Sequence, residues 1–289
     1  MKSPFFTGAC TALVTPFLQE QINYPMLQIL LQRQIDAGLE AVVICGTTGE
    51  SPTLSDREKL ELFTKAQEFS EGRIKIIAGT GSNDTLHTVE LSLAAQEAGA
   101  DGLLVVSPYY NKATPEGLYR HYLSVAHAVR IPIIIYNVPS RTAVDIPVSV
   151  YKRLSKVPNI VGVKEASTDI KKVLQIYREC GEDLTVWTGN DDMILPAIAM
   201  GAQGVISVAS NVFPDKIQAL TDLCLDGDLE NARKLQSQLL PLMEALFREV
   251  NPIPVKAAMA SIGLDCGRCR PPLTEATNET VVALKALLT

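Results

Sequence analysis

Short runs of apolar, mostly β-branched residues recur along this chain, and each is followed by a stretch with helical spacing. The runs are continuous in hydrophobicity rather than alternating, as in IVGVK or IPIII. Continuous apolar strands are buried on both faces, which is typical of a parallel sheet covered by helices. Eight runs are predicted to be strands: Gly8–Pro16, Ala41–Cys45, Ile74–Ala78, Gly102–Val106, Ile131–Tyr136, Ile160–Lys164, Leu184–Trp187 and Gly204–Val208.

The segments between these runs show helix start and stop signals. Tyr24–Ala37 carries leucines and isoleucines three and four residues apart, and Gly38 follows it. Ser55 stands three residues before Glu58, which is a capping-box pattern. Repeated strand–helix units with short links favour an α/β fold, a (β/α)8 TIM barrel, and the 289 residues suffice for one. An open doubly wound sheet is the alternative, although the G-x-G-x-x-G motif of a Rossmann fold is missing after the first strand.

The alternation stops near residue 228. Only helical stretches are predicted beyond it: Leu229–Leu240, Met243–Val250, Val255–Ile262 and Glu275–Leu288. We therefore expect residues 1–227 to form the barrel that carries the active site, and residues 228–289 to form a C-terminal helical appendage.

Charge and hydropathy exclude several classes of protein. The chain has 26 basic and 32 acidic residues, a net charge of −6, which argues against nucleic-acid binding. No apolar run reaches the ~18 residues of a membrane span. The N-terminus shows no secretory signal, so we expect a cytoplasmic protein. Cys266 and Cys269 form a C-x-x-C, but no second ligand pair follows, so no metal is expected.

Lys164 is the residue that most needs explaining. In a (β/α)8 barrel the active site lies at the C-terminal ends of the strands, and Lys164 ends an otherwise apolar one. A buried, unpaired ammonium costs several kcal/mol, so burial favours the neutral amine, a Schiff-base nucleophile for carbonyl substrates. Alternatively, Lys164 pairs with Glu50 or Glu165, or its side chain reaches solvent.

Other strand ends supply groups that suit such a nucleophile. Tyr136 offers a phenol for proton transfer, and Thr47 and Thr48 lie on a glycine-flanked turn whose N–H groups can face an anion. Arg141 could bind a carboxylate through two hydrogen bonds. Each also has an ordinary reading, as a core tyrosine, a capped turn or a surface ion pair. A histidine triad is not expected, because the histidines fall in helical stretches: His87, His121 and His127.

Together, the motifs resemble the dihydrodipicolinate synthase / N-acetylneuraminate lyase family of class I aldolases. The resemblance extends over essentially the whole chain. The motifs that carry it are ALVTPF (Ala12–Phe17), GTTGES (Gly46–Ser51), AGTGSN (Ala78–Asn83), PYYN (Pro108–Asn111), YNVPSRT (Tyr136–Thr142), GVKEAS (Gly162–Ser167), GVISV (Gly204–Val208) and NPIPVK (Asn251–Lys256).

Three features favour the synthase branch over the lyases. The lyases typically read GSTGE where this chain has Thr47, and they typically lack an arginine at the position of Arg141. Tyr109 and Tyr110 resemble the tyrosine pair of the synthases. The resemblance thus implies condensation of pyruvate with L-aspartate 4-semialdehyde, the first committed step of diaminopimelate and lysine biosynthesis. The alternatives are N-acetylneuraminate lyase and keto-deoxy-gluconate aldolase.

The resemblance also implies residue roles. Lys164 would form an imine with pyruvate, and Thr48 would hold the pyruvate carboxylate. Arg141 would hold the carboxylate of the semialdehyde. Further residues would relay protons or contact substrate: Tyr136, Thr47 and Tyr110 in the relay, with Tyr110 supplied by a neighbouring subunit, and Gly189 and Val208 at the substrate. No metal or organic cofactor is implied, and the expected assembly is a homotetramer, a dimer of dimers.

Regulation by lysine is where this chain departs from part of the family. The lysine-binding positions of the inhibited synthases are matched by Ser51, Asn83 and Tyr109, but their glutamate is replaced by His87. Their two histidines look replaced by Asp56 and Lys59. A histidine cannot pair with the ammonium of lysine as a glutamate does, and Lys59 adds like charge. We therefore predict weak or absent inhibition by lysine.

Overall fold

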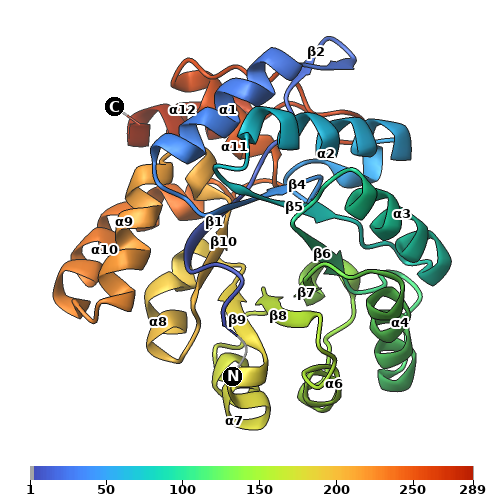
Figure 1. The fold of residues 1–289 in the computed structure, drawn as a ribbon. Coiled ribbons are helices and arrows are strands. Elements are labelled where there is room, and N and C mark those ends of the chain that lie inside the picture. Colours follow the sequence, from blue (N-terminus) through green and yellow to red (C-terminus); the bar gives the residue numbers. More distant parts are fainter. Residues whose placement is uncertain (1–2, 289) are drawn as a thin grey trace.

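The computed structural model describes residues 3–288. Within this range, eight parallel strands close into a barrel in the order β1-β10-β9-β8-β7-β6-β5-β4 (Figure 1). The predicted (β/α)8 barrel is confirmed, and each predicted run contributes one strand. These strands are β1 (Gly8–Ala12), β4 (Ala41–Ile44), β5 (Lys75–Gly79), β6 (Gly102–Val106), β7 (Ile133–Asn137), β8 (Ile160–Glu165), β9 (Thr185–Thr188) and β10 (Gly204–Ser207).

Helices surround the barrel, as Figure 1 shows. One helix of the outer ring follows each strand: α1 (Tyr24–Asp36), α2 (Asp56–Ser70), α3 (Thr85–Glu97), α4 (Pro115–Ala128), α6 (Val148–Leu154), α7 (Lys171–Cys180), α8 (Ile194–Ala199) and α9 (Pro214–Leu225). Short elements decorate the loops: the hairpin β2 (Phe17–Leu18) and β3 (Gln21–Ile22), helix α5 (Pro139–Thr142), and the 3₁₀ turns η1 (Ser51–Thr53), η2 (Gly181–Asp183), η3 (Asp191–Met193) and η4 (Ala209–Asn211).

Closure depends on the contact between the first and last strands. β1 pairs with both β4 and β10, and Gly8 lies opposite Gly204. Gly204 has φ +149°, and a Cβ there would overlap the carbonyl oxygen of Gly8. Only glycine allows the two strands to approach this closely. Because β1 pairs with both β4 and β10, the sheet is closed, and the open-sheet alternative is wrong.

Two layers of apolar side chains form the core. One fills the barrel and includes Phe6, whose ring stacks on Trp187 at 4.5 Å between centroids. The other, larger layer lies between the strands and the helices. Because side chains alternate along a strand, successive residues of β8 belong to different layers. Lys164 therefore points to the inside of the barrel, and Glu165 points to the helices.

Three helices follow the barrel, namely α10 (Leu229–Ala245), α11 (Ile253–Ser261) and α12 (Asn278–Leu288). The expected separate helix Met243–Val250 is wrong. α10 continues through Pro241 to Ala245, and the chain then turns before α11. Leu239, Leu242 and Met243 are buried, so packing holds the helix together where proline removes one hydrogen bond.

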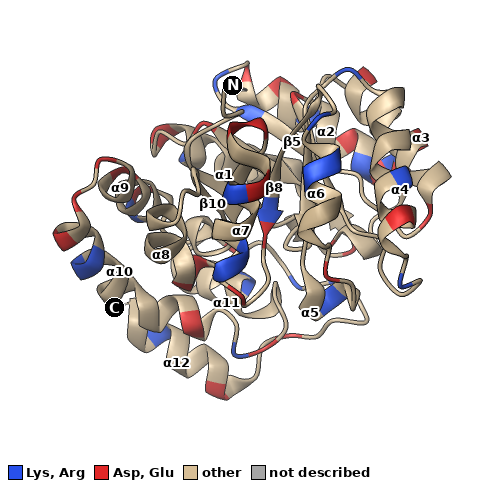
Figure 2. Cartoon of the chain, turned by 90° about the horizontal axis from the view of Figure 1, so that it is seen from below, with Lys and Arg blue, Asp and Glu red and all other residues tan. Residues whose placement is uncertain are grey.

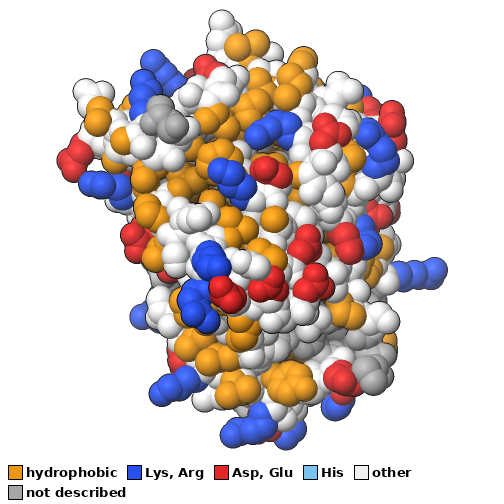
Figure 3. All heavy atoms as spheres, turned by 90° about the vertical axis from the view of Figure 1, so that its left-hand side faces the viewer, with side chains coloured by type: hydrophobic (Ala, Val, Ile, Leu, Met, Phe, Trp, Pro, Cys, Tyr) orange, Lys and Arg blue, Asp and Glu red, His pale blue; other side chains and the backbone are white. Residues whose placement is uncertain are grey.

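The surface matches the expectation of a mildly acidic protein. Blue and red positions are interspersed over the outer helices and loops in Figure 2. Figure 3 shows hydrophobic side chains gathered on the side that carries α9 and α10. A groove there is lined by Phe213, Leu235, Leu239, Leu242 and Leu287 among others. Within residues 3–288, no helix is long and apolar enough to cross a membrane.

Candidate active site

Lys164 and Tyr136 lie side by side at the ends of β8 and β7. Their Cα atoms are partners in the strand register. The Lys164 Nζ lies 4.5 Å from the centroid of the Tyr136 ring. Both side chains are buried, with 5% and 6% of their surface exposed, so Lys164 does not reach solvent as one alternative required.

The two carboxylates that could have paired with Lys164 are bound to other lysines. Glu50 forms an ion pair with Lys256 at 2.6 Å, and Glu165 lies 3.7 Å from Lys172. Glu165 also accepts hydrogen bonds from Asn137 at 2.8 Å and from the Tyr151 hydroxyl at 3.2 Å. Among residues 3–288, no carboxylate is in an ion pair with Lys164. The amine is thus buried inside the barrel without an ion-pair partner among these residues, and the acid that interacts with its charge is the buried Asp191.

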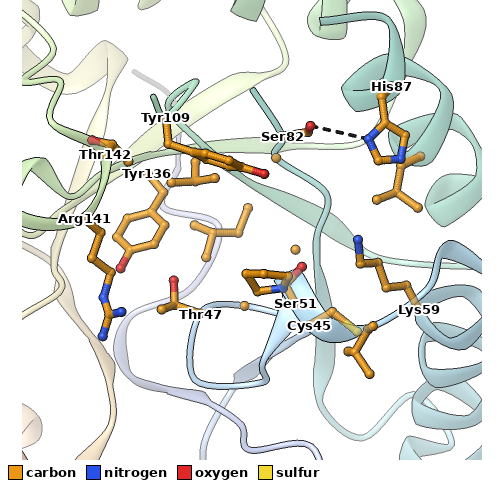
Figure 4. A pocket seen from close by; sticks show the side chains of 18 of the residues that line it. Cys45, Thr47, Ser51, Lys59, Ser82, His87, Tyr109, Tyr136, Arg141 and Thr142 are labelled. Atoms are coloured by element: carbon orange, nitrogen blue, oxygen red, sulfur yellow. Dashed lines mark hydrogen bonds between the residues drawn. The ribbon is translucent and has the colours of Figure 1, made fainter. Parts of the chain in front are cut away.

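The turn after β4 carries the two predicted threonines. Cys45 and Glu50 on either side of it have φ values of 56° and 57°, so the chain is tightly wound here. Thr48 is buried, and its hydroxyl accepts a hydrogen bond from the Asn251 Nδ2 at 2.9 Å. Thr47 is partly exposed and faces the cavity in Figure 4.

A cavity of about 630 Å³ opens at this end of the barrel. In Figure 4, Thr47, Tyr136 and Arg141 lie at one end of it, and Lys59 and His87 lie at the other. Lys164 is not part of the wall and lies behind the ring of Tyr136. The remaining polar lining residues include Ser51, Ser55, Asp56, Ser82, Tyr109 and Thr142.

Arg141 belongs to the short helix α5, where it is exposed on the cavity wall. Its guanidinium donates to the backbone carbonyl of Asn251 at 3.2 Å. An exposed guanidinium on a cavity wall retains donors for a substrate carboxylate. The structure therefore places Arg141 and Thr47 on the same cavity, and their predicted roles toward substrate stay predictions.

Gly189 follows β9, which is next to β8, and Val208 follows β10, which is one strand further round the barrel. A Cβ at Gly189 would lie 2.9 Å from the Cε of Lys164 and 2.6 Å from the Cβ of Ala166. The lysine chain therefore needs a glycine here. The backbone N–H of Val208 donates to Asp191 Oδ2 at 3.0 Å. Burial raises the pKa of the Asp191 carboxyl, partly offset by hydrogen bonds from Ser207 and from the backbone.

Tyr109 and Tyr110 point to different places. Tyr109 lines the cavity and is 38% exposed, whereas Tyr110 is 88% exposed and does not line it. Tyr110 has φ 71°, a left-handed backbone conformation that is uncommon for a residue with a side chain. Within one chain it is therefore not brought together with Lys164. Its predicted role, which requires a second subunit, stays a prediction.

The other end of the cavity collects the residues expected at a regulatory site. His87 Nε2 lies 2.8 Å from Asp56 Oδ2, and Lys59 Nζ lies 3.5 Å from the same carboxylate. Burial by itself would raise the pKa of the Asp56 carboxyl. The hydrogen bonds and charges of His87 and Lys59 outweigh this effect, so the pKa is lower than its usual value. Ser51 and Ser82 line the same end. Asn83 does not line the cavity; its backbone carbonyl accepts from Asn111 at 2.7 Å.

The C-x-x-C segment offers little reactivity. Both of its cysteines are free thiols. Burial raises the pKa of Cys266 to about 12 and that of Cys269 to about 12, so the thiolate form is disfavoured in both. Within the described residues, no group of three histidine, cysteine or acidic side chains could hold a metal ion.

Sequence reasoning missed the contribution of the C-terminal segment. Asn251 contacts both Thr48 and Arg141, and Lys256 neutralises Glu50. The NPIPVK motif was the available signal, but it identified a family and assigned no role to either residue. Asp191 was also overlooked, although a buried acid after an apolar strand was visible in the sequence.

The geometry matches that of known proteins. Residues 5–289 match the model of the dihydrodipicolinate synthetase family. The chain belongs to this family. A relative from Acetivibrio thermocellus, named 4-hydroxy-tetrahydrodipicolinate synthase, is 47% identical over 100% of this chain and 98% of its own. The family resemblance of the sequence motifs is thereby confirmed.

Solved structures of family members agree with this fold. The dihydrodipicolinate synthase of Aquifex aeolicus has a TM-score of 0.96 and 45% identity, over 98% of this chain and 97% of its own. A chloride-inhibited synthase from Acinetobacter baumannii, complexed with pyruvate, also has a TM-score of 0.96, with 38% identity over 98% of both chains.

Proposed function

We propose that this chain is a 4-hydroxy-tetrahydrodipicolinate synthase, which condenses pyruvate with L-aspartate 4-semialdehyde through an imine on Lys164. The observation that carries the proposal is the amine of Lys164, which is buried beside the ring of Tyr136 and has no ion-pair partner among residues 3–288. Such an amine in a dry site is a nucleophile for a ketone. The names of the relatives support the choice of substrates.

In the first stage, the Lys164 nitrogen attacks the ketone carbon of pyruvate and water leaves, which gives the imine. Tyr136 and Thr47 carry protons to and from the reacting oxygen in this scheme, because both line this end of the cavity and both have a hydroxyl group. Thr48 and its turn hold the pyruvate carboxylate. Gly189 leaves room for the lysine chain. Val208, which follows β10, contacts the substrate in this scheme.

In the second stage, loss of a proton from the pyruvate methyl group gives an enamine, which attacks the aldehyde carbon of the semialdehyde. The carboxylate of that substrate binds Arg141. The substrate amine then closes the ring on the imine carbon and releases the lysine. The protonated imine is itself the electron sink, so this scheme needs no metal or organic cofactor. Activity that survives dialysis against a chelator supports it, and lost activity that a metal restores contradicts it.

A second copy of the chain supplies Tyr110 in this proposal. Tyr110 is 88% exposed and does not line the cavity of its own chain, so its side chain is available to a neighbouring chain. We propose a homotetramer, a dimer of dimers, in which Tyr110 completes the partner's proton relay. Analytical ultracentrifugation checks the assembly. Equal activity per chain in a dissociated monomer contradicts the shared site.

The decisive experiment traps the first intermediate. The protein is incubated with pyruvate and reduced with borohydride, and the modified peptide is mapped by mass spectrometry. An adduct on Lys164 is expected, and Lys164→Arg is expected to give none. Lys172→Arg serves as the matched control, because Lys172 is also buried but is paired with acids. A folded protein without an adduct contradicts the mechanism at its first step.

The second substrate is identified by comparing aspartate semialdehyde with N-acetylmannosamine. We expect turnover only with the semialdehyde. Arg141→Ala is expected to raise the KM for the semialdehyde about tenfold or more, with little change in the KM for pyruvate. Turnover of N-acetylmannosamine supports the lyase alternative instead.

We also propose that lysine inhibits this enzyme weakly or not at all. Among the described residues that line the cavity, Asp56 is the one acid, and it is already bound by His87 and Lys59. A lysine ligand would therefore bring a further positive charge next to Lys59. Inhibition at sub-millimolar lysine contradicts this. We place the enzyme in the cytoplasm, where its six free cysteines fit a reducing compartment; localisation of a tagged chain tests this.

A further inference from the structure

The C-terminal segment reaches the turn after β4 through an ion pair that the reaction scheme does not use. Lys256 of α11 lies 2.6 Å from Glu50, and their side chains are 4% and 0% exposed. Five residues earlier in the chain, Asn251 donates to the hydroxyl of Thr48 at 2.9 Å. Thr48 and Glu50 are separated only by Gly49. One segment therefore holds two nearly adjacent residues of the turn.

Both members of the pair have further partners, which fix their orientation. Glu50 Oε2 accepts the backbone N–H of Arg270 at 2.8 Å. Lys256 Nζ donates to the Arg268 carbonyl at 3.3 Å and lies 4.4 Å from the centroid of the Phe17 ring. A buried charge pair needs such additional bonds to offset the cost of removing it from water. The ion pair and its additional hydrogen bonds therefore connect the C-terminal segment to the turn after β4 in a defined geometry.

The turn is also held from the other side. The Thr15 hydroxyl donates to the carbonyl of Gly49 at 2.7 Å. Glu50 itself has φ 57°, a left-handed conformation that side chains rarely adopt unless surrounding contacts impose it. Without Lys256, Glu50 loses its ion-pair partner, while the hydrogen bonds of Thr15, Asn251 and Arg270 to the turn do not involve Lys256.

We infer that Glu50 and Lys256 are positioning residues that fix the Thr47–Thr48 turn for the substrate carboxylate. Neither residue lines the cavity, so they act through the turn and do not touch substrate. A displacement of about 1 Å in a binding group can lower activity about 100-fold, so a small shift of the turn has a large effect. The inference rests on the proposed function for the role of the turn.

The test compares Lys256→Met with the wild type. The pyruvate concentration that gives half-maximal borohydride-trapped adduct is measured, together with the KM of each substrate, kcat and the thermal unfolding curve. We expect the half-maximal pyruvate concentration to rise about tenfold or more, and the KM for the semialdehyde to change less than threefold. Lys234→Met is the control, because Lys234 forms an exposed pair with Glu230 on α10. It is expected to behave as the wild type.

The outcomes separate this inference from the proposed function. If the wild type forms no adduct, the proposed function fails. If the wild type forms an adduct and folded Lys256→Met reaches it at the same pyruvate concentration, the positioning role is wrong and the pair is only structural. If Lys256→Met does not fold, Lys256→Arg provides the test of the positioning role. This variant keeps the positive charge, but the larger guanidinium group places the charge at a different position. We expect Lys256→Arg to unfold near the wild-type temperature with a raised KM for pyruvate, and an unchanged KM overturns the inference.

Discussion

Two buried lysines at the same end of the barrel have opposite surroundings. Lys164 and Lys256 are 5% and 4% exposed, so both have lost almost all contact with water. Lys256 lies against Glu50, a backbone carbonyl and an aromatic ring. Lys164 has the ring of Tyr136 and no ion-pair partner among residues 3–288. The difference shows that burial alone does not distinguish the two lysines, whereas a close ion-pair partner does.

The contrast follows from how each acid is used. Glu165 is next to Lys164 in the chain but points to the opposite face of β8, where Lys172 and Tyr151 bind it. Burial, and then the charge of Glu165, raise the pKa of the Tyr151 hydroxyl. Because successive side chains of β8 alternate, Glu165 lies in the layer between the strands and the helices, and Lys164 lies inside the barrel.

Replacing Lys164 is expected to have the largest effect on catalysis and little effect on stability. Lys164→Met should lower kcat/KM about a thousandfold or more, because the covalent step is lost. It should leave the free energy of unfolding unchanged or higher, since an unpaired buried amine is exchanged for an apolar chain. Enzyme assays and urea unfolding check both. A large loss of stability in Lys164→Met would show that Lys164, like Lys256, contributes to stability, and would contradict the contrast between the two lysines.

Replacing Lys256 should have the reverse profile for stability. Lys256→Met leaves Glu50 buried without a counter-charge, which should lower the free energy of unfolding by about 3–5 kcal/mol. Urea unfolding measures it. The surface variant Lys234→Met should stay within about 0.5 kcal/mol of the wild type. Equal stabilities for Lys256→Met and Lys164→Met would contradict the contrast.

A smaller change tests how closely the strand ends confine Lys164. In Gly189→Ala, the new methyl group meets the lysine chain and Ala166, so Lys164 must shift. We expect kcat to fall about 10- to 100-fold with most stability retained. Gly117→Ala is the control, because the contacts of a Cβ there, at 3.4 and 3.6 Å, are ordinary. Unchanged kcat in Gly189→Ala would show that the lysine chain has room to spare.

The smallest expected effect is on stability. It arises from the ion pair between Glu58 and Arg270 and depends on pH. A hydrogen bond from Arg270 lowers the pKa of Glu58 from 4.5 to about 2. A carboxyl whose pKa is lower in the folded state stabilises the protein above pH 4.5, and this is lost as the pH falls toward 2. Both side chains are partly exposed, so the contribution is on the order of 1 kcal/mol.

The measurement compares Arg270→Gln with the wild type by urea unfolding at several pH values. The variant should be less stable at pH 7, and the difference should shrink below pH 4.5. A difference that stays constant down to pH 3 would assign the loss to packing of the Arg270 side chain on Phe17, 4.5 Å away, and not to the charge of Glu58.

The sequence predicted the strands well because their signal is local. A continuous apolar run identifies a strand buried on both faces, and β6 begins and ends where its run does. Closure was not visible, since it depends on pairing of β1 with β10 across most of the chain. The helix Met243–Val250 was wrong because the packing of Leu242 and Met243, which local spacing does not report, holds α10 past Pro241.

The site was predictable only where the chemistry lies in the residue type. A lysine and a tyrosine at strand ends are conspicuous, and the structure brings Lys164 and Tyr136 together. The supporting contacts were not visible, because Asn251 meets Thr48 across 203 residues of sequence. No local pattern reports such a contact.

The closed barrel also determines when its strands can pair during synthesis, because β1 pairs with β10. β1 leaves the ribosome early, but its partner β10 follows about 200 residues later, roughly 10–40 s at bacterial and eukaryotic rates of synthesis. During that interval, one edge of the growing sheet has unpaired backbone groups, which are open to other chains. Two residues that hold the turn after β4, Asn251 and Lys256, are translated after all eight strands. The nascent barrel therefore has this turn before it has the C-terminal contacts that hold it.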